Sequence, residues 1–176
     1  MIVDLLDYAM RISTRGRYGL RAMLDLAMNP NCEPVRMSAV ARRQALSRKY
    51  LHALLTTLKT AGLVRGVRGA GGGFVLARPP AEIKLSEILH ALEGPLSLVD
   101  CVADERFCDR TNHCPARHVW LTLAGAINDV LERFTLADLV ALENEGGAKE
   151  SRNRGTSKNA RIPTPARARR RKAGKK

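Results

Sequence analysis

The segment "CVADERFCDRTNHCPARH", residues 101 to 118, gathers side chains that could bind a metal or react with an oxidant. It holds three of the chain's four cysteines and two of its four histidines: Cys101, Cys108, His113, Cys114 and His118. Thiolates and imidazoles are metal ligands, and two thiols can instead form a disulfide. A bound metal, a disulfide and chance are therefore the three explanations that the remaining sequence must separate.

The N-terminal sequence argues against secretion. "MIVDLLDYAM" contains acids and has no basic segment before its short apolar run, which is unlike a secretory signal. No run approaches about 18 apolar residues, so we expect a cytoplasmic protein without a transmembrane helix or membrane contact. In a reducing compartment, clustered cysteines are more often metal ligands or reactive thiols than structural disulfides.

The net charge of +13 is concentrated near the C-terminus. From Lys149 onward, 12 Lys and Arg residues face one acid, Glu150, whereas residues 1–148 carry a net charge of only +2. Basic tails usually bind polyanions, most often nucleic acid. Residues 144–176 have few large apolar side chains, so we predict a disordered basic tail there.

Two helices joined by a tight turn are predicted before the cysteine segment. Residues 13–29 begin with hydroxyl side chains, continue as an amphipathic stripe and end at Asn-Pro, which indicates a first helix. Ser38 is predicted to cap a short helix that ends near Gln44, and Ser47 to cap a longer helix that ends at Gly62. Such a pair is a helix-turn-helix.

The next stretch, "LVRGVRGAGGGFVLAR", favours a β-hairpin. Residues 63–68 and 74–77 are β-prone, and the glycines between them permit a turn with positive φ. A hairpin directly after a helix-turn-helix is the arrangement of a winged helix. We therefore predict a mainly α fold with a small β-hairpin wing, and a DNA-binding domain over residues 10–80.

This arrangement predicts which side chains contact double-stranded DNA. An α-helix fits the major groove, whose edges are lined by phosphates, so the second helix should begin with hydrogen-bond donors. Arginines on a wing can enter a minor groove. The predicted DNA-binding residues are on the first helix (Arg42, Arg43), at the start of the second (Ser47, Arg48, Lys49, Tyr50) and on the wing (Arg65, Arg68).

Residues 81–143 are predicted to form the cysteine segment and helices for dimerisation. "KLSEILHALEG" is a short amphipathic helix that ends at Gly94. After the cysteine segment, apolar residues recur at steps of three and four over residues 119–134, a stripe longer than one helix needs to dock on a small domain. Thr135 is positioned to cap a last helix.

These motifs, in this order, resemble the Rrf-two family of bacterial winged-helix transcriptional regulators (the IscR/NsrR/CymR group). "MRISTRGRYGLRAMLDLA", the glycine-rich wing, "LSEILHALEG", three spaced cysteines and "TLADL" carry the likeness over about residues 10–142. It implies a homodimer held by a long helix over residues 116–134, and a recognition helix over residues 48–61. Because Met10 aligns with the usual family start, residues 1–9 are an extension or follow a misplaced start codon.

The resemblance also implies an iron–sulfur cluster, 2Fe–2S or 4Fe–4S, held by Cys101, Cys108 and Cys114. Thiolates suit such clusters, and gaps of six and five residues do not match the C-x2-C spacing of structural zinc sites. The fourth ligand departs from the family pattern. Some members use a histidine three residues after the third cysteine, where this chain has Arg117, and others use an acid before the early tyrosine, where it has Arg17.

His118 is the first choice for the fourth ligand. His113, an acid such as Asp7 of the partner subunit, and an exogenous ligand are the other candidates. Cys32 has no potential partner nearby in the sequence, so we expect a loop thiol without a function.

The predicted function is a dimeric repressor that binds a near-palindromic operator and senses iron–sulfur, redox or nitric-oxide status. A linker-histone-like architectural protein is an alternative, because a winged helix with a basic tail describes both. A metal-free regulator that uses thiol chemistry is another. We expect no enzyme, because no acid/base pair or nucleophile constellation lies outside the cysteine segment.

Overall fold

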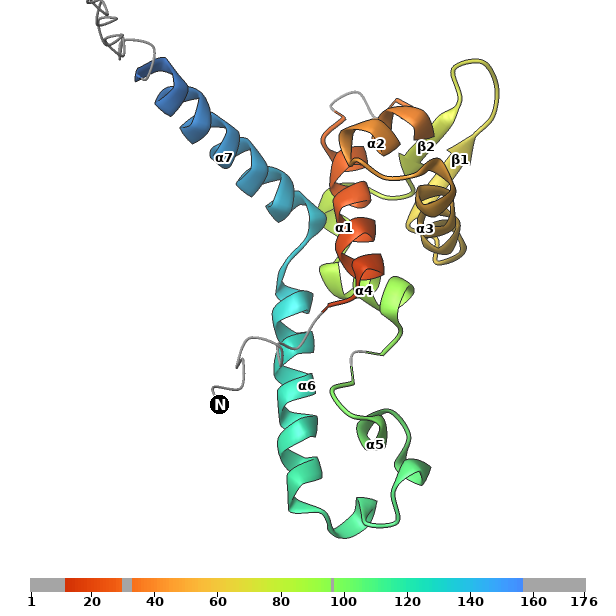
Figure 1. Ribbon diagram of the computed structural model, residues 1–176, viewed down its shortest axis with the longest axis vertical. Helices are drawn as coiled ribbons and strands as arrows, with labels where there is room; N and C mark the ends of the chain where they lie inside the picture. The colour runs from red at the N-terminus through yellow and green to blue at the C-terminus, as the bar shows by residue number, and fades with distance from the viewer. Residues whose placement is uncertain (1–11, 30–32, 96, 157–176) are drawn as a thin grey trace, which may run out of the picture. The chain divides into compact units, whose positions relative to one another are not determined.

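A computed structural model describes residues 12–29, 33–95 and 97–156, with side chains as far as residue 146 (Figure 1). One compact unit ends at Leu142, and a second begins at Glu143. The helices and strands are α1 (Thr14–Ala27), α2 (Met37–Arg43), α3 (Arg48–Thr60), β1 (Val64–Val67), β2 (Gly73–Leu76), α4 (Leu85–Glu93), α5 (Asp100–Ala103), α6 (Pro115–Arg133) and α7 (Leu136–Thr156). The mainly α fold with one β-hairpin is the one predicted.

The helix-turn-helix is confirmed as α2 and α3. Ser47 caps α3 as predicted, because its Oγ accepts a hydrogen bond from the backbone N–H of Tyr50 at 3.2 Å. The start of α1 is also confirmed, since the Ser13 Oγ accepts from the backbone N–H groups of Arg15 and Gly16. Ordinary N-caps of this kind contribute about 1 kcal/mol each to helix stability.

The predicted N-cap of α2 is wrong by two residues. The N-cap is Arg36 rather than Ser38, and no side chain caps the helix. Val35 forms an isolated antiparallel bridge with Phe74, with both backbone hydrogen bonds at 2.9 Å. Because this bridge fixes Val35 in an extended conformation, the chain enters the helix at once, and Met37 packs against the core.

The wing is an antiparallel hairpin in which Arg65 lies opposite Val75. Its base is wider than the sequence predicted, because Val35 adds a third backbone segment beside β2. This close approach requires glycine at position 73, since a Cβ atom there would overlap the carbonyl group of Val35. The wing is therefore attached to the start of α2 as well as to the end of α3.

Aliphatic side chains from α1, α2, α3, α4 and the start of the wing form one continuous core, as the low aromatic content requires. Its largest fully buried members are Met23, Val40, Leu51, Leu54, Leu55, Leu58, Leu63, Val64, Ile83, Ile88 and Leu136. In contrast, α6 has no buried residue along its 19 positions. The core therefore positions the helix-turn-helix, and α6 lies largely outside it.

The segment between α4 and α6 begins with a sharp change of direction. Gly94 ends α4 with φ of +83°, a left-handed value that favours glycine. Residues 97–114, called the cysteine loop below, then contain α5 and two short 3-10 turns. After α6, the buried Leu136 returns to the core, and its N–H donates to the carbonyl oxygen of Ile83 at 2.9 Å.

The last helix is longer than the sequence predicted. Thr135 caps α7, because its hydroxyl oxygen accepts from the backbone N–H of Asp138 at 3.3 Å. The Asp138 carboxylate in turn accepts from the Thr135 N–H and hydroxyl, and these bonds lower the pKa of Asp138. The helix continues to Thr156, past the predicted start of the disordered tail. Its last eleven residues combine three glycines, which are poor helix formers, with alanine, lysine, glutamate and arginine, which are good ones. Residues 1–11, Cys32 and residues 157–176 lie outside the described residues.

Among the described residues, no helix is long and apolar enough to cross a membrane.

Candidate nucleic-acid interface and cysteine loop

The first turn of α3 presents two basic side chains to solvent. Arg48 and Lys49 are exposed, and they follow the Ser47 cap directly. The opposite side of α3 carries Leu51 and Leu55, which are fully buried in the core. The core thus fixes the orientation of α3 and leaves its basic first turn free to enter a groove.

Tyr50 is less accessible to DNA than Arg48 and Lys49 are. It is half-buried, and its ring packs edge-on against Tyr18 of α1, with centroids 6.2 Å apart and planes at 88°. The guanidinium of Arg21 lies 5.5 Å from the centroid of the Tyr18 ring. Such edge-on pairs contribute about 0.5–1.5 kcal/mol beyond burial. Tyr50 therefore holds α1 against α3, whatever its hydroxyl contacts.

Arg42 and Arg43 are adjacent in sequence but differ in their contacts. Arg43 donates two hydrogen bonds to the carboxylate of Asp25, at 2.8 and 2.5 Å, and this pairing raises the pKa of Arg43. Only 4% of the Asp25 side chain is exposed, and the carboxylate also accepts from Gln44 at 3.0 Å. Arg42 is exposed and has no such partner among the described residues. Arg43 thus connects α2 to α1.

A further arginine, Arg36, lies beside the predicted interface. Arg36, Arg42 and Arg48 line one shallow hollow at the junction of α2 and α3. Arg36 also donates to the backbone carbonyl of Ala70 at the wing tip, at 3.1 Å. Arg36 is not among the residues predicted to bind DNA, although its position directly before α2 could have indicated it. Three guanidinium groups at one hollow suit a phosphate.

The wing arginines are both exposed. Arg65 projects from β1, and Arg68 lies directly after β1, at the start of the tip. The structure therefore exposes five of the eight predicted DNA-binding residues: Arg42, Arg48, Lys49, Arg65 and Arg68. It places Arg43, Ser47 and Tyr50 in contacts within the protein.

The three cysteines of the loop are free thiols, and each is half-buried. No disulfide therefore links them. Cys101 lies in α5, Cys108 follows the first 3-10 turn, and Cys114 directly precedes α6. Both His113 and His118 are exposed.

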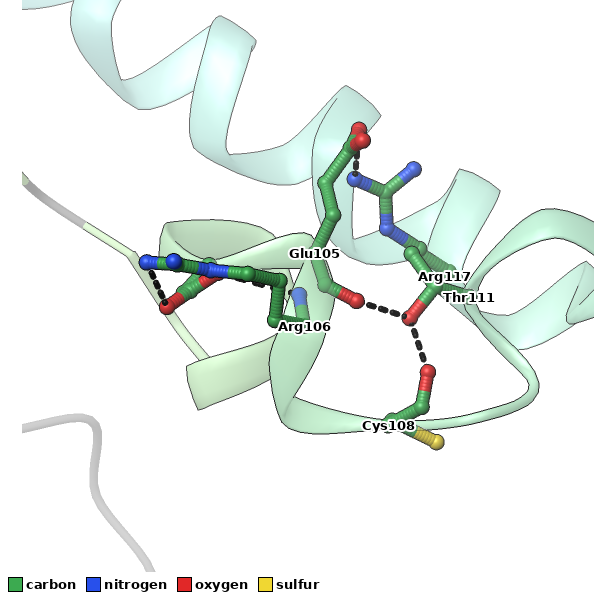
Figure 2. Close-up of polar contacts among 6 residues, drawn as sticks. Glu105, Arg106, Cys108, Thr111 and Arg117 are labelled. Carbon is green, nitrogen blue, oxygen red and sulfur yellow. Dashed lines mark hydrogen bonds and ion pairs between the residues drawn. The ribbon is translucent and has the colours of Figure 1, made fainter.

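Polar contacts hold the cysteine loop in its conformation. The hydroxyl of Thr111, which is buried, bonds to the carbonyl oxygens of Glu105 and Cys108, the first at 2.8 Å (Figure 2). Arg117 of α6 donates to the carboxylate of Glu105 at 2.8 Å and to the carbonyl of Cys101 at 3.1 Å. The Cys108 thiol points away from Thr111 (Figure 2).

The three thiols are of the right chemical type to bind an iron–sulfur cluster, but they do not lie close enough together to do so. Three thiolates are the ligands that such clusters prefer. In the part of the chain that the structure describes, however, no three His, Cys, Asp or Glu side chains lie close enough together to hold a metal ion. A cluster on Cys101, Cys108 and Cys114 would require a different conformation of the loop.

Comparison with known proteins identifies the family. A model of the Rrf2 family, described as an iron-dependent transcriptional regulator, matches residues 12–142. The HTH-type transcriptional regulator CymR of Bacillus subtilis is 40% identical over 133 residues, which cover 75% of this chain and 91% of CymR.

Two solved structures show the same fold. T. potens IscR superposes with a TM-score of 0.66 at 38% identity, over 78% of this chain and 91% of IscR. The structure of B. subtilis CymR, described as the global cysteine regulator, superposes with a TM-score of 0.64 at 38% identity, over 76% of this chain and 98% of CymR. These proteins are regulators of transcription rather than enzymes, in agreement with the prediction. The chain belongs to the Rrf2 family of DNA-binding transcriptional regulators.

Proposed function

We propose that this Rrf2-family regulator is a repressor that binds a near-palindromic operator as a homodimer and uses its cysteine loop as the sensor. The observation that carries the sensor role is the position of the three half-buried free thiols. They lie on the segment that connects α4, the last helix of the DNA-binding core, to α6. A chemical change at these thiols would therefore alter the segment that joins α4 to α6.

The dimer is proposed from the exposed apolar side chains of α6. Val119, Leu123 and Val130 are each 42–51% exposed, and Trp120 and Phe134 extend the same surface. Single exposed apolar residues are common, but a continuous row along one helix usually marks an interface. In a two-fold dimer this surface faces its own copy, and the two α3 helices then read two half-sites about one helical turn apart.

The proposed signal is iron–sulfur, redox or nitric-oxide status. Cys101, Cys108 and Cys114 would hold a 2Fe–2S or 4Fe–4S cluster, with His118 as the first candidate for a fourth ligand. When bound, the cluster supplies a redox-active centre that oxidants and nitric oxide attack. The chain's own contribution is to provide the thiolates on a loop that polar contacts, rather than a core, keep in place.

The test is the visible absorption spectrum of the full chain purified without oxygen. A brown protein with charge-transfer absorption, lost in Cys108→Ala, supports the cluster. Colourless protein that carries stoichiometric zinc contradicts it. Cys32→Ala is the matched control, because it removes one thiol that the proposal does not use and should leave the colour unchanged.

A second candidate is a regulator that uses the thiols without a metal. The separation of the thiols among the described residues favours it. Reversible loss of operator binding after mild oxidation of metal-free protein, prevented by Cys108→Ala, would favour this candidate. The family match itself favours either regulator over an architectural linker-histone-like protein.

A further inference from the structure

Arg117 lies in the first turn of α6 and reaches back across the cysteine loop. Its Nε donates to the carbonyl oxygen of Cys101 at 3.1 Å. A terminal nitrogen donates to Glu105 Oε1 at 2.8 Å (Figure 2). Only 15% of the Arg117 side chain is exposed. A guanidinium stays charged in proteins, so burying it is costly unless its N–H groups are paired. These two contacts make the burial of Arg117 tolerable.

Glu105 receives a second contact from within the loop. Its carbonyl oxygen accepts from the hydroxyl of Thr111, which also bonds to the carbonyl of Cys108. The backbone of Glu105 is thus fixed by Thr111, and its carboxylate is fixed by Arg117 (Figure 2). Through these bonds one arginine of α6 restrains the backbone at Cys101 directly and at Cys108 indirectly.

Apolar packing adds little to this restraint. Phe107, the loop's aromatic residue, is 66% exposed, and no apolar residue of the loop or of α6 is fully buried among the described residues. A segment with few buried apolar contacts opens at a low free-energy cost, which is set by the hydrogen bonds that must break. The contacts of Arg117 therefore contribute to that cost. The bond to the Cys101 carbonyl should contribute more than the ion pair with Glu105, whose side chain is 74% exposed.

We propose that Arg117 is a positioning residue that holds the cysteine loop against α6 with the three thiols apart, and that its release controls their accessibility and their gathering around a metal. The proposal deepens the sensor role and rests on it. It explains why the thiols of the described loop are free and do not lie close enough together to bind a metal ion. It also assigns a role to a buried charge that DNA binding does not use.

Pulsed alkylation of the reduced, metal-free full chain tests the proposal. Iodoacetamide is added for increasing times, and peptide mass spectrometry gives the alkylation rate at Cys101, Cys108 and Cys114 separately. In Arg117→Ala we expect the rates at Cys101 and Cys108 to rise about tenfold, since a tenfold larger open fraction corresponds to losing about 1.4 kcal/mol. Losing a nearby positive charge would by itself slow alkylation, so an acceleration reports opening.

Arg106→Ala is the matched control. Arg106 also forms an ion pair with an acid of the loop, Asp104, at 3.1 Å. Its side chain is 90% exposed, and its partner is only two positions away, so the pair does not connect the loop to α6. Alkylation in Arg106→Ala should stay within about twofold of the unmodified chain. Equal acceleration in both variants would mean general loosening, and would overturn the proposal.

Glu105→Ala provides an independent arm should Arg117→Ala fold poorly. It should also accelerate alkylation at Cys101 and Cys108, and by more than Asp104→Ala does. Asp104→Ala removes a loop acid that is not paired with α6, so it measures the acceleration that comes from lost negative charge alone. The double variant with both substitutions should be no faster than Arg117→Ala alone, because both remove the same contact. If the double variant instead raises the alkylation rate by the product of the two single factors, the two residues act separately, which contradicts the proposal.

Anaerobic reconstitution with ferrous iron and sulfide separates this inference from the sensor role. If the unmodified chain gains no visible absorption while Arg117→Ala accelerates alkylation as expected, the cluster is contradicted and the positioning role of Arg117 stands. If the chain does gain the absorption while alkylation is the same in Arg117→Ala and in the unmodified chain, the positioning role fails and the cluster stands.

Discussion

Residues 13–94, called the DNA-binding unit below because they carry the helix-turn-helix, extend past the predicted domain boundary at residue 80 to include α4. They and the loop-and-helix region, residues 97–134, are held together by different forces. In the first, aliphatic side chains of four helices and the wing are excluded from water. In the second, Thr111 is the one buried residue among those described, and α6 exposes a row of large apolar side chains. Burial of this kind contributes about 25 cal/mol per Å² of apolar surface, so the first unit holds its own shape. The second has little apolar core among the described residues, so the polar contacts of Thr111 and Arg117 supply more of its restraint.

Both ends of the loop-and-helix region are fixed to the DNA-binding unit. At one end, the carboxylate of Glu93 accepts from the hydroxyl of Ser13 at 2.5 Å and from the N–H of Gly16 at 2.6 Å. At the other end, the fully buried Leu136 follows α6 closely. A region with little core of its own, attached at both ends to a rigid one, can change shape and still act on α1 and α4. This arrangement suits a sensor.

The largest effect is expected from placing charges on the exposed apolar row of α6. Leu123 is 42% exposed, and Ile127, one turn further along the same face, is half-buried. In the proposed dimer interface, Leu123→Asp combined with Ile127→Asp would bury two carboxylates without partners, at more than about 3 kcal/mol each. We expect a monomer, measured by light scattering after size exclusion. Helix content should remain, because the core of the DNA-binding unit is untouched.

The control is Thr122→Asp, which adds a charge to an exposed polar position of the same helix. It should remain dimeric. A double variant that is still dimeric would contradict the interface and would leave the exposed row without the partner proposed for it.

Two substitutions by alanine, each made in the monomeric Leu123→Asp/Ile127→Asp variant, test the difference between the two regions without a contribution from the dimer interface. Leu55 is fully buried in α3, so Leu55→Ala should lower the free energy of unfolding by about 2–5 kcal/mol through lost burial and a cavity. Val130 of α6 is 51% exposed, so Val130→Ala should change it by less than about 0.5 kcal/mol. Denaturant titration gives both values. Similar losses at the two sites would show that α6 has a core of its own.

The same difference explains how far the sequence could predict the structure. The DNA-binding unit was predictable because local signals agreed with its packing, as the Ser47 cap and the left-handed Gly94 show. The error at Ser38 arose from a contact distant in sequence, the bridge between Val35 and Phe74. Spacing identified the three cysteines of the loop as candidates. It could not reveal that Arg117 reaches back to the loop, because that contact joins residues 12 and 16 positions apart.

Within the DNA-binding unit, Arg48→Ala should separate specific from non-specific binding. Arg48 is exposed in the first turn of α3, where recognition helices meet base edges. We expect a loss of about 1–3 kcal/mol on an operator selected from random duplexes, and a smaller loss on random DNA. Fluorescence anisotropy at fixed salt measures both. An equal loss on the two DNAs would make Arg48 a phosphate contact only.

The smallest expected effects concern Arg42 and Arg43, for which the structure suggests different roles. Arg43→Ala would leave the carboxylate of Asp25, 4% exposed, with Gln44 as its remaining α2 partner. We expect the free energy of unfolding to fall by about 1–2 kcal/mol, less than for a fully buried pair, because Arg43 itself is 48% exposed. Arg42→Ala should leave unfolding within about 0.5 kcal/mol of the unmodified chain.

For DNA binding we expect the reverse: Arg42→Ala should have the larger effect and Arg43→Ala the smaller. Arg42 lines the hollow shared with Arg36 and Arg48, so losing one phosphate contact there should reduce the slope of log affinity against log salt by about 0.9. Arg43→Ala should leave that slope unchanged, since its guanidinium is engaged with Asp25. Denaturant titration and salt-dependent anisotropy on the same two variants decide the matter. If Arg43→Ala instead reduces the slope and leaves the free energy of unfolding unchanged, Arg43 contacts DNA as the sequence predicted. Its guanidinium would then exchange the Asp25 carboxylate for a DNA phosphate on binding.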